Sequence, residues 1–326
     1  MNNRIANNRI AVVGAGAWGT ALAIQAVRAG RDVVLWARDP ARAAMIAENR
    51  QNPRLPGIAL PEAIEVTSLL PDDAAAILLV VPTQHLREIA ARLPRGPAPL
   101  LVCAKGVEVG TTRLPLEILA ELHPGRPAAV LSGPNFAAEI ARGLPAAAVI
   151  AAADADLREH LAALLATPQF RLYGNDDPVG AQVGGAAKNV IAIAAGAVIG
   201  AGLGENARAA LITRGLAELS RLIVALGGKA ETATGLSGLG DLLLTCTGPS
   251  SRNYSLGHAL GRGETLAAIL AGRSTVTEGV TTAPALIARA SGVEMPVCAA
   301  VAAVVAGRIT VTQAMTALLA RPRRDE

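Results

Sequence analysis

Lysine is rare in this chain, and two of its three lysines lie in segments that could carry out chemistry. Lys105, Lys188 and Lys229 stand among 30 basic residues, and all the others are arginine. Arginine can replace lysine where only positive charge is needed, but it stays protonated and cannot exchange a proton. A lysine kept in so arginine-rich a chain therefore indicates a site that needs a compact ammonium. Lys229 follows two glycines and is expected at the surface.

Lys188 lies in a long segment, residues 179–204, that contains no other charged residue. Such a lysine is expected to be poorly solvated, and burial lowers the pKa of a lysine, sometimes by several units. A lysine with a lowered pKa can accept as well as donate a proton near neutral pH. The alternative is a lysine that packs its stem along a helix and keeps its ammonium in water.

Two further polar segments each follow an apolar run that is typical of a buried strand. The first is Cys103-Ala-Lys105-Gly106, and the second is Ser132-Gly133-Pro134-Asn135-Phe136-Ala137. Open α/β sheets bind ligands at the carboxyl ends of their strands, so both segments are candidates for ligand contacts. The second also opens a helix, whose backbone amides could face an anion. The alternative for both is an ordinary turn between a strand and a helix.

Two segments in the second half of the chain offer a carboxylate and an arginine. Asp241 follows a glycine-rich stretch and is the one acidic residue of a long apolar run, where the alternative is a helix N-cap. Ser251-Arg252-Asn253 combines an arginine with hydrogen-bonding neighbours. The planar guanidinium suits the bidentate binding of phosphate, although a solvated surface arginine is the alternative.

A glycine-rich turn near the amino terminus predicts a dinucleotide site. Gly14-Ala-Gly16-Ala-Trp18-Gly19 has the GxGxxG spacing, with an apolar strand before it and a helix after it. The first glycine makes the tight turn, the second lets the backbone approach a pyrophosphate, and the third lets helix and strand pack closely. In this context the motif is good evidence for NAD or NADP binding, against the alternative of a plain glycine-rich turn.

The residue that meets the cofactor's 2′ position follows the second strand, residues 33–36. Arg38 comes first there and favours a 2′-phosphate, whereas an acidic residue would bind a 2′-hydroxyl. Asp39 precedes Pro40 and is expected to be the N-cap of the next helix. The sequence therefore favours NADP over NAD.

These residues are expected on two kinds of scaffold. Apolar strands alternate with amphipathic helices in the first half, which predicts a mostly parallel sheet covered on both faces. The second half, from residue 183, has helical spacing and almost no strand-like alternation. We therefore predict an α/β Rossmann-type domain over residues 1–180 and an all-α substrate and catalytic domain over 181–326. The predicted strands are 9–13, 33–36, 64–67, 76–81, 100–104, 128–131, 146–151 and 170–173. The predicted helices are 18–29, 41–49, 83–92, 114–122, 137–142, 156–166, 188–201, 205–226, 255–261, 265–271, 283–290, 298–305 and 311–319.

Composition and charge exclude several other classes of protein. The mean hydropathy is +0.40, but the longest uncharged run, residues 10–27, contains glycine, threonine and glutamine, so we expect no transmembrane helix. No secretory signal pattern opens the chain, and three widely spaced cysteines fit neither a disulfide framework nor a zinc site. The net charge of +4 comes from scattered residues, which is too little for a nucleic-acid surface. The four histidines are isolated, so no metal site is expected; they are His85, His123, His160 and His258.

The motifs GxGxWGTALA, AKG, SGPxFA, GGAxKN, GLxGLGDLxLT and SRN occur here in this order and cover nearly the whole chain. In this combination the chain resembles bacterial NAD(P)-dependent glycerol-3-phosphate dehydrogenase. The resemblance implies a Rossmann-type domain followed by a helical domain. It also implies the interconversion of dihydroxyacetone phosphate and sn-glycerol 3-phosphate, which supplies phospholipid synthesis.

The resemblance also assigns roles to individual residues. It makes Lys188 the catalytic lysine, which accepts the proton when glycerol 3-phosphate is oxidised. The implied substrate contacts are Lys105, Gly133, Asn135, Lys188, Asp241, Ser251, Arg252 and Asn253. The cofactor contacts, with the glycines of the first motif, are Gly14, Gly16, Trp18, Gly19, Arg38, Lys105, Ala137, Arg252, Val276 and Glu278. Two residues depart from the family pattern: Ala17 replaces a frequent serine, and Asn135 replaces the usual serine or threonine.

Two other classes remain open from the sequence. A two-domain dehydrogenase of a β-hydroxy acid would also place a lysine on the first helix of its second domain, but SRN and GLGDL favour a phosphate substrate. A non-catalytic nucleotide sensor would need the glycine motif without Lys188 and Asp241. We further expect a cytoplasmic homodimer, with no nucleic-acid partner and no integral membrane segment.

Overall fold

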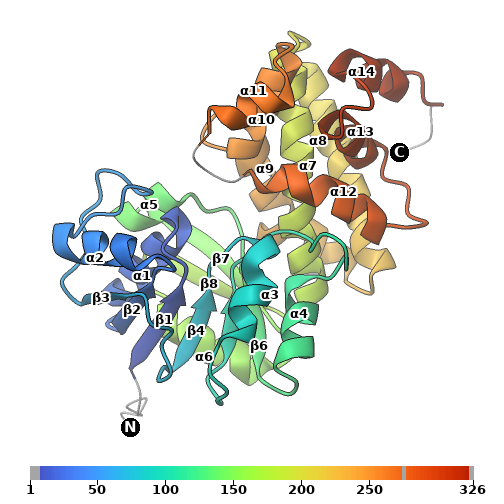
Figure 1. Cartoon of the computed structure of the whole chain (residues 1–326). Coiled ribbons are helices and arrows are strands. Elements are labelled where there is room, and N and C mark those ends of the chain that lie inside the picture. Colours follow the sequence, from blue (N-terminus) through green and yellow to red (C-terminus); the bar gives the residue numbers. More distant parts are fainter. Residues whose placement is uncertain (1–7, 274–276, 323–326) are drawn as a thin grey trace. The chain divides into compact units, whose positions relative to one another are not determined.

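The computed structural model describes residues 8–273 and 277–322, and the chain forms two compact units (Figure 1). The sheet unit comprises Met1–Lys105 and Leu114–Pro178. The helical unit comprises Gly106–Arg113 and Val179–Glu326. The chain therefore passes from one unit to the other at three points, because a short segment inside the first half belongs to the helical unit.

One mostly parallel sheet of eight strands runs through the sheet unit, in the order β3-β2-β1-β4-β5-β6-β7-β8. All neighbouring strands are parallel except β6 and β7, which are antiparallel. The order of the first six strands is that of the doubly wound dinucleotide-binding fold, so the predicted fold class is confirmed. The strands are β1 (Arg9–Val13), β2 (Asp32–Trp36), β3 (Ile64–Thr67), β4 (Ala76–Leu79), β5 (Leu100–Val102), β6 (Ala128–Ser132), β7 (Ala146–Ala151) and β8 (Phe170–Asn175).

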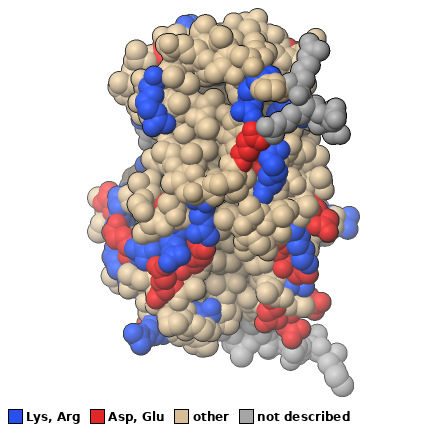
Figure 2. Space-filling model, turned by 90° about the vertical axis from the view of Figure 1, so that its right-hand side faces the viewer, with Lys and Arg blue, Asp and Glu red and all other residues tan. Residues whose placement is uncertain are grey.

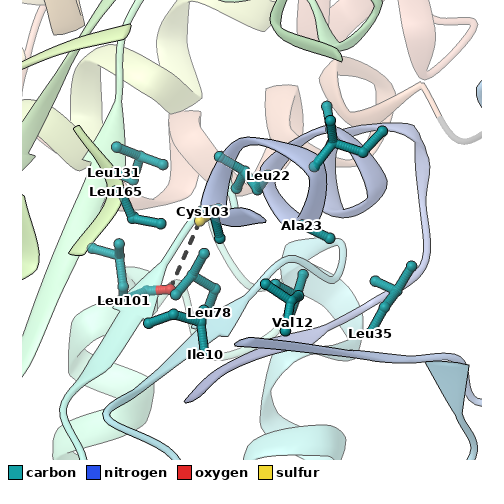
Figure 3. Close-up of a cluster of buried hydrophobic side chains, with 14 of the residues drawn as sticks. Ile10, Val12, Leu22, Ala23, Leu35, Leu78, Leu101, Cys103, Leu131 and Leu165 are labelled. Carbon is teal, nitrogen blue, oxygen red and sulfur yellow. Dashed lines mark hydrogen bonds between the residues drawn. The ribbon is translucent and has the colours of Figure 1, made fainter. Parts of the chain in front are cut away.

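Helices cover both faces of this sheet, as continuous runs of valine, isoleucine and leucine in the strands require. One face packs against α1, α2, α5 and α6 around side chains such as Ile10, Val12 and Leu35 (Figure 3). The other packs against α3 and α4 around Val13, Ile77 and Leu79. The helices are α1 (Ala17–Arg28), α2 (Pro40–Asn49), α3 (Thr83–Ala91), α4 (Pro115–Leu122), α5 (Ala137–Arg142) and α6 (Ala155–Leu165).

The helical unit contains α-helices, a 3-10 turn and one π-helical turn. It has the helical character that the sequence predicts. Its helices are α7 (Pro178–Gly200), α8 (Gly204–Ala225), α9 (Asp241–Cys246), α10 (Arg252–Gly261), α11 (Leu266–Ala271), α12 (Glu278–Arg289), α13 (Pro296–Val305) and α14 (Val311–Leu319). The 3-10 turn is η1 (Ala230–Thr234), and the π-helical turn is η2 (Leu236–Gly240).

Helix α7 extends further toward the amino terminus than predicted, because it begins at Pro178 rather than at residue 188. Three glycines in this part have low intrinsic helix propensity, which favours a loop when only the sequence is considered. At Gly184 the absence of a side chain serves packing instead. A Cβ at Gly184 would lie 2.4 Å from the carbonyl oxygen of Ser237, so only glycine lets η2 approach α7.

The helices α7 and α10 also cross at very short range, through glycines on both partners. A Cβ at Gly196 would lie 2.0 Å from the Tyr254 carbonyl oxygen, and one at Gly257 would lie 1.9 Å from the Ile193 carbonyl oxygen. Gly200 and Gly261 repeat this contact one turn further along each helix. The close crossing fixes α10 along its length against the last third of α7.

By length and composition alone, α7 could cross a membrane, with a mean hydropathy of 1.6 over an 18-residue window. However, 83% of that window is buried inside the protein. A core helix of a globular protein meets the same criterion, and α7 packs as one. Its apolar composition is thus explained by its position in the helical unit.

The segment Gly106–Arg113 forms a tight loop within the helical unit. Val107 is fully buried and Glu108 is mostly buried. The amide of Glu108 donates to the carbonyl of Arg113 at 2.9 Å, and the amide of Thr112 donates to the carbonyl of Glu108 at 3.0 Å. Thr112 has a left-handed backbone with φ of +57°, which closes the turn.

The face shown in Figure 2 is mostly uncharged, with separate groups in which residues of both signs lie side by side. The exposed ion pairs of the protein include Arg9 with Glu65 in the sheet unit and Arg321 with Glu294 in the helical unit. Exposed pairs of this kind contribute little to stability, because water and salt screen them.

Candidate active site

The glycine turn between β1 and α1 has the shape that a bound dinucleotide requires. Gly14 has a φ of +124°, and a Cβ there would lie 2.5 Å from the carbonyl oxygen of Val80. A Cβ at Gly19 would lie 1.9 Å from the carbonyl oxygen of Gly14, so helix and strand meet there. At Gly16 nothing lies within 4 Å of the Cβ position. The open space thus lies where a pyrophosphate approaches the start of α1, and the residues fit NAD or NADP.

The other predicted contacts of the sheet unit also follow the carboxyl ends of strands. Arg38 is exposed beyond the end of β2, and Ala137 is the first residue of α5. The side chain of Asp39 accepts a hydrogen bond from Ala41 at 3.1 Å, which confirms its role as the N-cap of α2. Lys105 follows β5, and its Nζ donates to the carbonyl oxygen of Gly133 at 3.1 Å. The sheet edge therefore brings Lys105 and Gly133 together.

Asn135, which departs from the family pattern, is bonded to the sheet itself. Its Nδ2 donates to the carbonyl oxygen of Ala147 at 3.1 Å. Its Oδ1 is buried and has no hydrogen-bond partner among the described residues. A buried acceptor without a partner is costly, so a ligand that donates a hydrogen bond would be stabilised here. Gly133 has a φ of +133°, which keeps this turn compact.

In the helical unit, Lys188 of α7 and Asp241 of α9 form a buried ion pair. Lys188 Nζ lies 2.5 Å from Asp241 Oδ1, and the two side chains are only 11% and 1% exposed. Nζ also donates to Thr245 Oγ1 at 3.0 Å, while that hydroxyl donates to the carbonyl oxygen of Asp241 at 2.6 Å. Two side chains of α9 thus hold the ammonium of Lys188 in one orientation.

Asp241 is therefore the partner of Lys188 and not an N-cap. The N-cap position of α9 belongs to Gly240, and Asp241 directs its carboxylate toward α7. Cys246, one residue after Thr245, lies in the same buried region. Burial raises the pKa of the Cys246 thiol to about 12, although the nearby Lys188 ammonium acts in the opposite direction. The thiol stays protonated and cannot act as a nucleophile at neutral pH.

The three-residue segment Ser251–Asn253 begins α10 next to α7. Ser251 is the N-cap, and its hydroxyl oxygen accepts a hydrogen bond from the amide of Tyr254 at 3.2 Å. Asn253 Nδ2 donates to Asn189 Oδ1 at 2.8 Å, and Asn253 Oδ1 accepts from the amide of Gly279 at 2.9 Å. The structure thus joins the residue after Lys188 to the start of α10 and to the start of α12.

Arg252 is exposed, and a second arginine lies near it. Arg273 Nη1 donates to the carbonyl oxygen of Arg252 at 2.8 Å and to Thr277 Oγ1 at 3.3 Å. Burial lowers the pKa of Arg273, and the positive charge of Arg252 lowers it further. Two neighbouring guanidiniums at the first turn of α10 make this a favourable place for an anion.

Sequence reasoning missed Asn189, Thr245 and Arg273. Thr245 comes four residues after Asp241, one helical turn along, which was the available signal. Nothing in the sequence indicates a role for Arg273, because its hydrogen-bond partners belong to two other elements. Glu278 is the first residue of α12, while Val276 lies outside the described residues. Across residues 8–273 and 277–322, no group of three or more potential ligands could hold a metal ion.

A doubly wound sheet with a dinucleotide turn, followed by a helical unit with a buried lysine–aspartate pair, defines an NAD(P)-dependent oxidoreductase. The family model of the NAD-dependent glycerol-3-phosphate dehydrogenase N-terminus matches residues 9–158. The model of the C-terminus of the same family matches residues 177–316. The chain belongs to the NAD-dependent glycerol-3-phosphate dehydrogenase family.

Known relatives resemble the chain over its whole length. The glycerol-3-phosphate dehydrogenase of Acidiphilium cryptum is 58% identical over 98% of this chain and 99% of the relative. That of Gluconobacter oxydans is 54% identical over 96% of this chain and 97% of the relative. Among solved structures, glycerol-3-phosphate dehydrogenase from Coxiella burnetii has a TM-score of 0.93 and 38% identity, covering 97% and 99% of the two chains.

Proposed function

We propose that this protein interconverts dihydroxyacetone phosphate and sn-glycerol 3-phosphate with NADPH or NADH, and that the reduction supplies phospholipid synthesis. The buried cluster of Lys188, Asp241 and Thr245 is the observation that carries the proposal. Reduction of a ketone develops an alkoxide, which needs a proton donor and positive charge close by. A buried ammonium, fixed by a carboxylate and a hydroxyl, provides both.

The two units are proposed to have different roles in the reaction. In this proposal the sheet unit, with the span 1–180 expected from sequence, binds the dinucleotide through the glycine turn, Arg38 and Ala137. The bound nicotinamide supplies the hydride for the ketone carbon. The helical unit, expected over 181–326, binds and protonates the substrate. The relatives from Acidiphilium cryptum and Gluconobacter oxydans carry NAD(P) in their names, which supports NAD or NADP as the cofactor.

Lys188 is the proposed general acid for reduction and the general base for oxidation. Asp241 orients the ammonium, because its carboxylate Oδ1 lies 2.5 Å from Nζ. Thr245 adds a second acceptor at 3.0 Å. Removing one partner of a buried ion pair leaves the other charge uncompensated, so the lysine and the aspartate are expected to act as a unit.

The substrate phosphate is proposed to lie against Ser251, Arg252 and Asn253. The guanidinium of Arg252 is exposed at the first turn of α10, where the helix dipole also favours an anion. A phosphate held there would align the reacting carbon and convert remote binding energy into catalysis. Lys105, Gly133 and Asn135 are the proposed contacts from the sheet unit.

NADP is the proposed physiological cofactor. Arg38 follows β2 in the position that meets the 2′ substituent, and its side chain is exposed to a ligand there. Asp39 is occupied as an N-cap and does not compete for that position. The ratio of the rates with NADPH and NADH tests this proposal, and a clear preference for NADH would overturn it.

The decisive test compares lysine variants in an absorbance assay of cofactor oxidation with dihydroxyacetone phosphate. Lys188→Ala is expected to lower kcat by at least ~10²-fold, the usual contribution of a general acid. Lys188→Arg should be similarly impaired, because arginine keeps the charge but does not release the proton. Lys229→Ala removes an exposed lysine and is the matched control. Full activity of Lys188→Ala, or no turnover of the parent protein while cofactor still binds, would contradict the proposal.

A cytoplasmic homodimer is the proposed state of the protein. The helical unit exposes large apolar side chains, among them Leu203 and Val224 at the two ends of α8. Burial of such side chains in a subunit interface would remove apolar surface from water. All three cysteines are free and buried, which suits a reducing compartment. Sedimentation equilibrium and cell fractionation test these two points.

A further inference from the structure

Two separate connections join the start of α10 to the start of α12. The first runs through Asn253, whose amide donates to Asn189 Oδ1 at 2.8 Å and accepts from the Gly279 amide at 2.9 Å. The second runs through Arg273, which donates to the Arg252 carbonyl at 2.8 Å and to Thr277 Oγ1 at 3.3 Å. The segment with the proposed phosphate contacts is thus tied to the segment that contains Glu278.

The connection through Asn253 is buried and tightly packed. Asn253, Thr277 and Gly279 are all buried. A Cβ at Gly279 would lie 2.6 Å from Asn253 Oδ1 and 2.8 Å from the Asn189 carbonyl oxygen, so the start of α12 cannot shift toward α7 without a clash. The Gly279 N–H requires an acceptor, which fixes the amide of Asn253 in one orientation. The amide therefore has a positioning role besides its proposed contact with phosphate.

The stability of the connection through Arg273 depends on the charge near Arg252. Its guanidinium lies close enough to Arg252 for the positive charge of Arg252 to lower the pKa of Arg273. An anion bound at Arg252 would reduce this repulsion between the two cations. Such an anion therefore stabilises the arrangement in which Arg273 holds both Arg252 and Thr277.

We propose that Arg273 and Asn253 form a joint through which phosphate binding at Arg252 and cofactor binding at Glu278 reinforce each other. This inference rests on the proposed function, which assigns the substrate phosphate to Arg252, and on the family resemblance, which makes Glu278 a cofactor contact. Each ligand stabilises the arrangement of the joint that the other ligand contacts, so binding of one favours binding of the other. By linkage, each ligand must raise the affinity for the other by the same factor.

A dead-end pair of ligands measures this factor without turnover. NADPH and glycerol 3-phosphate are both reduced and cannot react with each other. The dissociation constant of NADPH, followed by its fluorescence, is compared with and without saturating glycerol 3-phosphate. In the parent protein we expect ~10-fold tighter NADPH binding in the ternary complex, within the usual range of such coupling.

Arg273→Ala is expected to bring the factor close to one. Arg262→Ala is the matched control, because it also removes one arginine, from the exposed end of α10, and should keep the full factor. Thr277→Val is a second variant that keeps every charge and removes one acceptor of Arg273. It is expected to lower the factor while the binary affinity for glycerol 3-phosphate stays the same.

Two results would overturn the inference: no coupling in the parent protein, or full coupling in both Arg273→Ala and Thr277→Val. Failure of the underlying assignments would look different. In that case Arg252→Ala would leave the affinity for glycerol 3-phosphate unchanged, or Glu278→Ala would leave that for NADPH unchanged. These binary measurements do not depend on the coupling factor, so the two failures are distinguishable.

Discussion

Replacing Gly257 by alanine should separate two helices that must touch for the site to form. A Cβ at this position would lie 1.9 Å from the carbonyl oxygen of Ile193, which belongs to the backbone of α7. A backbone oxygen on a helix cannot rotate away as a side chain can. Relief therefore requires α10 to move away from α7 as a body, and α10 begins with Arg252 and Asn253.

The magnitude follows from the size of that displacement. To reach an ordinary contact distance, the backbones of α7 and α10 must move apart by ~1.5 Å. Overpacking of this size destabilises a protein by ~3 kcal/mol, the upper end of the usual range. Alanine recovers ~1 kcal/mol through its higher helix propensity. The net loss of ~2 kcal/mol in the free energy of unfolding corresponds to a fall in Tm of about 4–8 °C for a unit of this size.

The same displacement should affect substrate affinity. The hydrogen bond between Asn253 and Asn189 is 2.8 Å long and cannot survive a shift of this size. We therefore expect a higher KM for dihydroxyacetone phosphate together with the lower Tm. Gly248→Ala is the control, because nothing lies within 4 Å of the Cβ position there. If Gly257→Ala matched Gly248→Ala in both Tm and KM, the argument for a close crossing would be refuted.

Two further predictions concern buried groups outside the reacting centre. Glu218 accepts hydrogen bonds from the amides of Val297 and Cys298, and burial raises its pKa above 4.5. Because the folded-state pKa is the higher one, this group favours folding more as pH falls from neutral toward 4.5. Glu218→Gln should lower Tm at every pH, and the gap to the parent protein should widen on acidification; a constant gap would contradict this reasoning. Burial also raises the pKa of Cys103 to about 12. Iodoacetamide at mildly alkaline pH should therefore leave Cys103 and the activity intact until denaturant is added, and mass spectrometry of the native protein would reveal early labelling if the thiol were reactive.

Local sequence patterns were sufficient for most of the sheet unit. The eight predicted strands are confirmed, with bounds that differ by at most two residues. Their valine, isoleucine and leucine runs are long enough to be recognised without tertiary context. The glycine turn could be predicted for the same reason, because Gly14, Gly16 and Gly19 act within one strand–turn–helix element.

Other features depend on contacts between distant elements and could not be predicted in this way. The first turns of α7 contain glycines that disfavour a helix locally, and the approach of Ser237 explains one of them, Gly184. Asp241 resembles an N-cap until α7 is placed beside α9. Arg273 is an ordinary arginine in the sequence, because its role depends on partners in two elements that meet only in the folded chain.

The loop Gly106–Arg113 has a consequence for how the protein is made. The helical unit is not a contiguous piece of the chain, because this loop is synthesised well before α7. A fragment that starts at α7 would lack Val107 and Glu108, and the side chains that bury them would be left exposed to solvent. During synthesis, the loop likewise cannot pack against the rest of the helical unit until the carboxyl-terminal half has left the ribosome. The helical unit therefore completes a packing arrangement that begins before the sheet unit is finished.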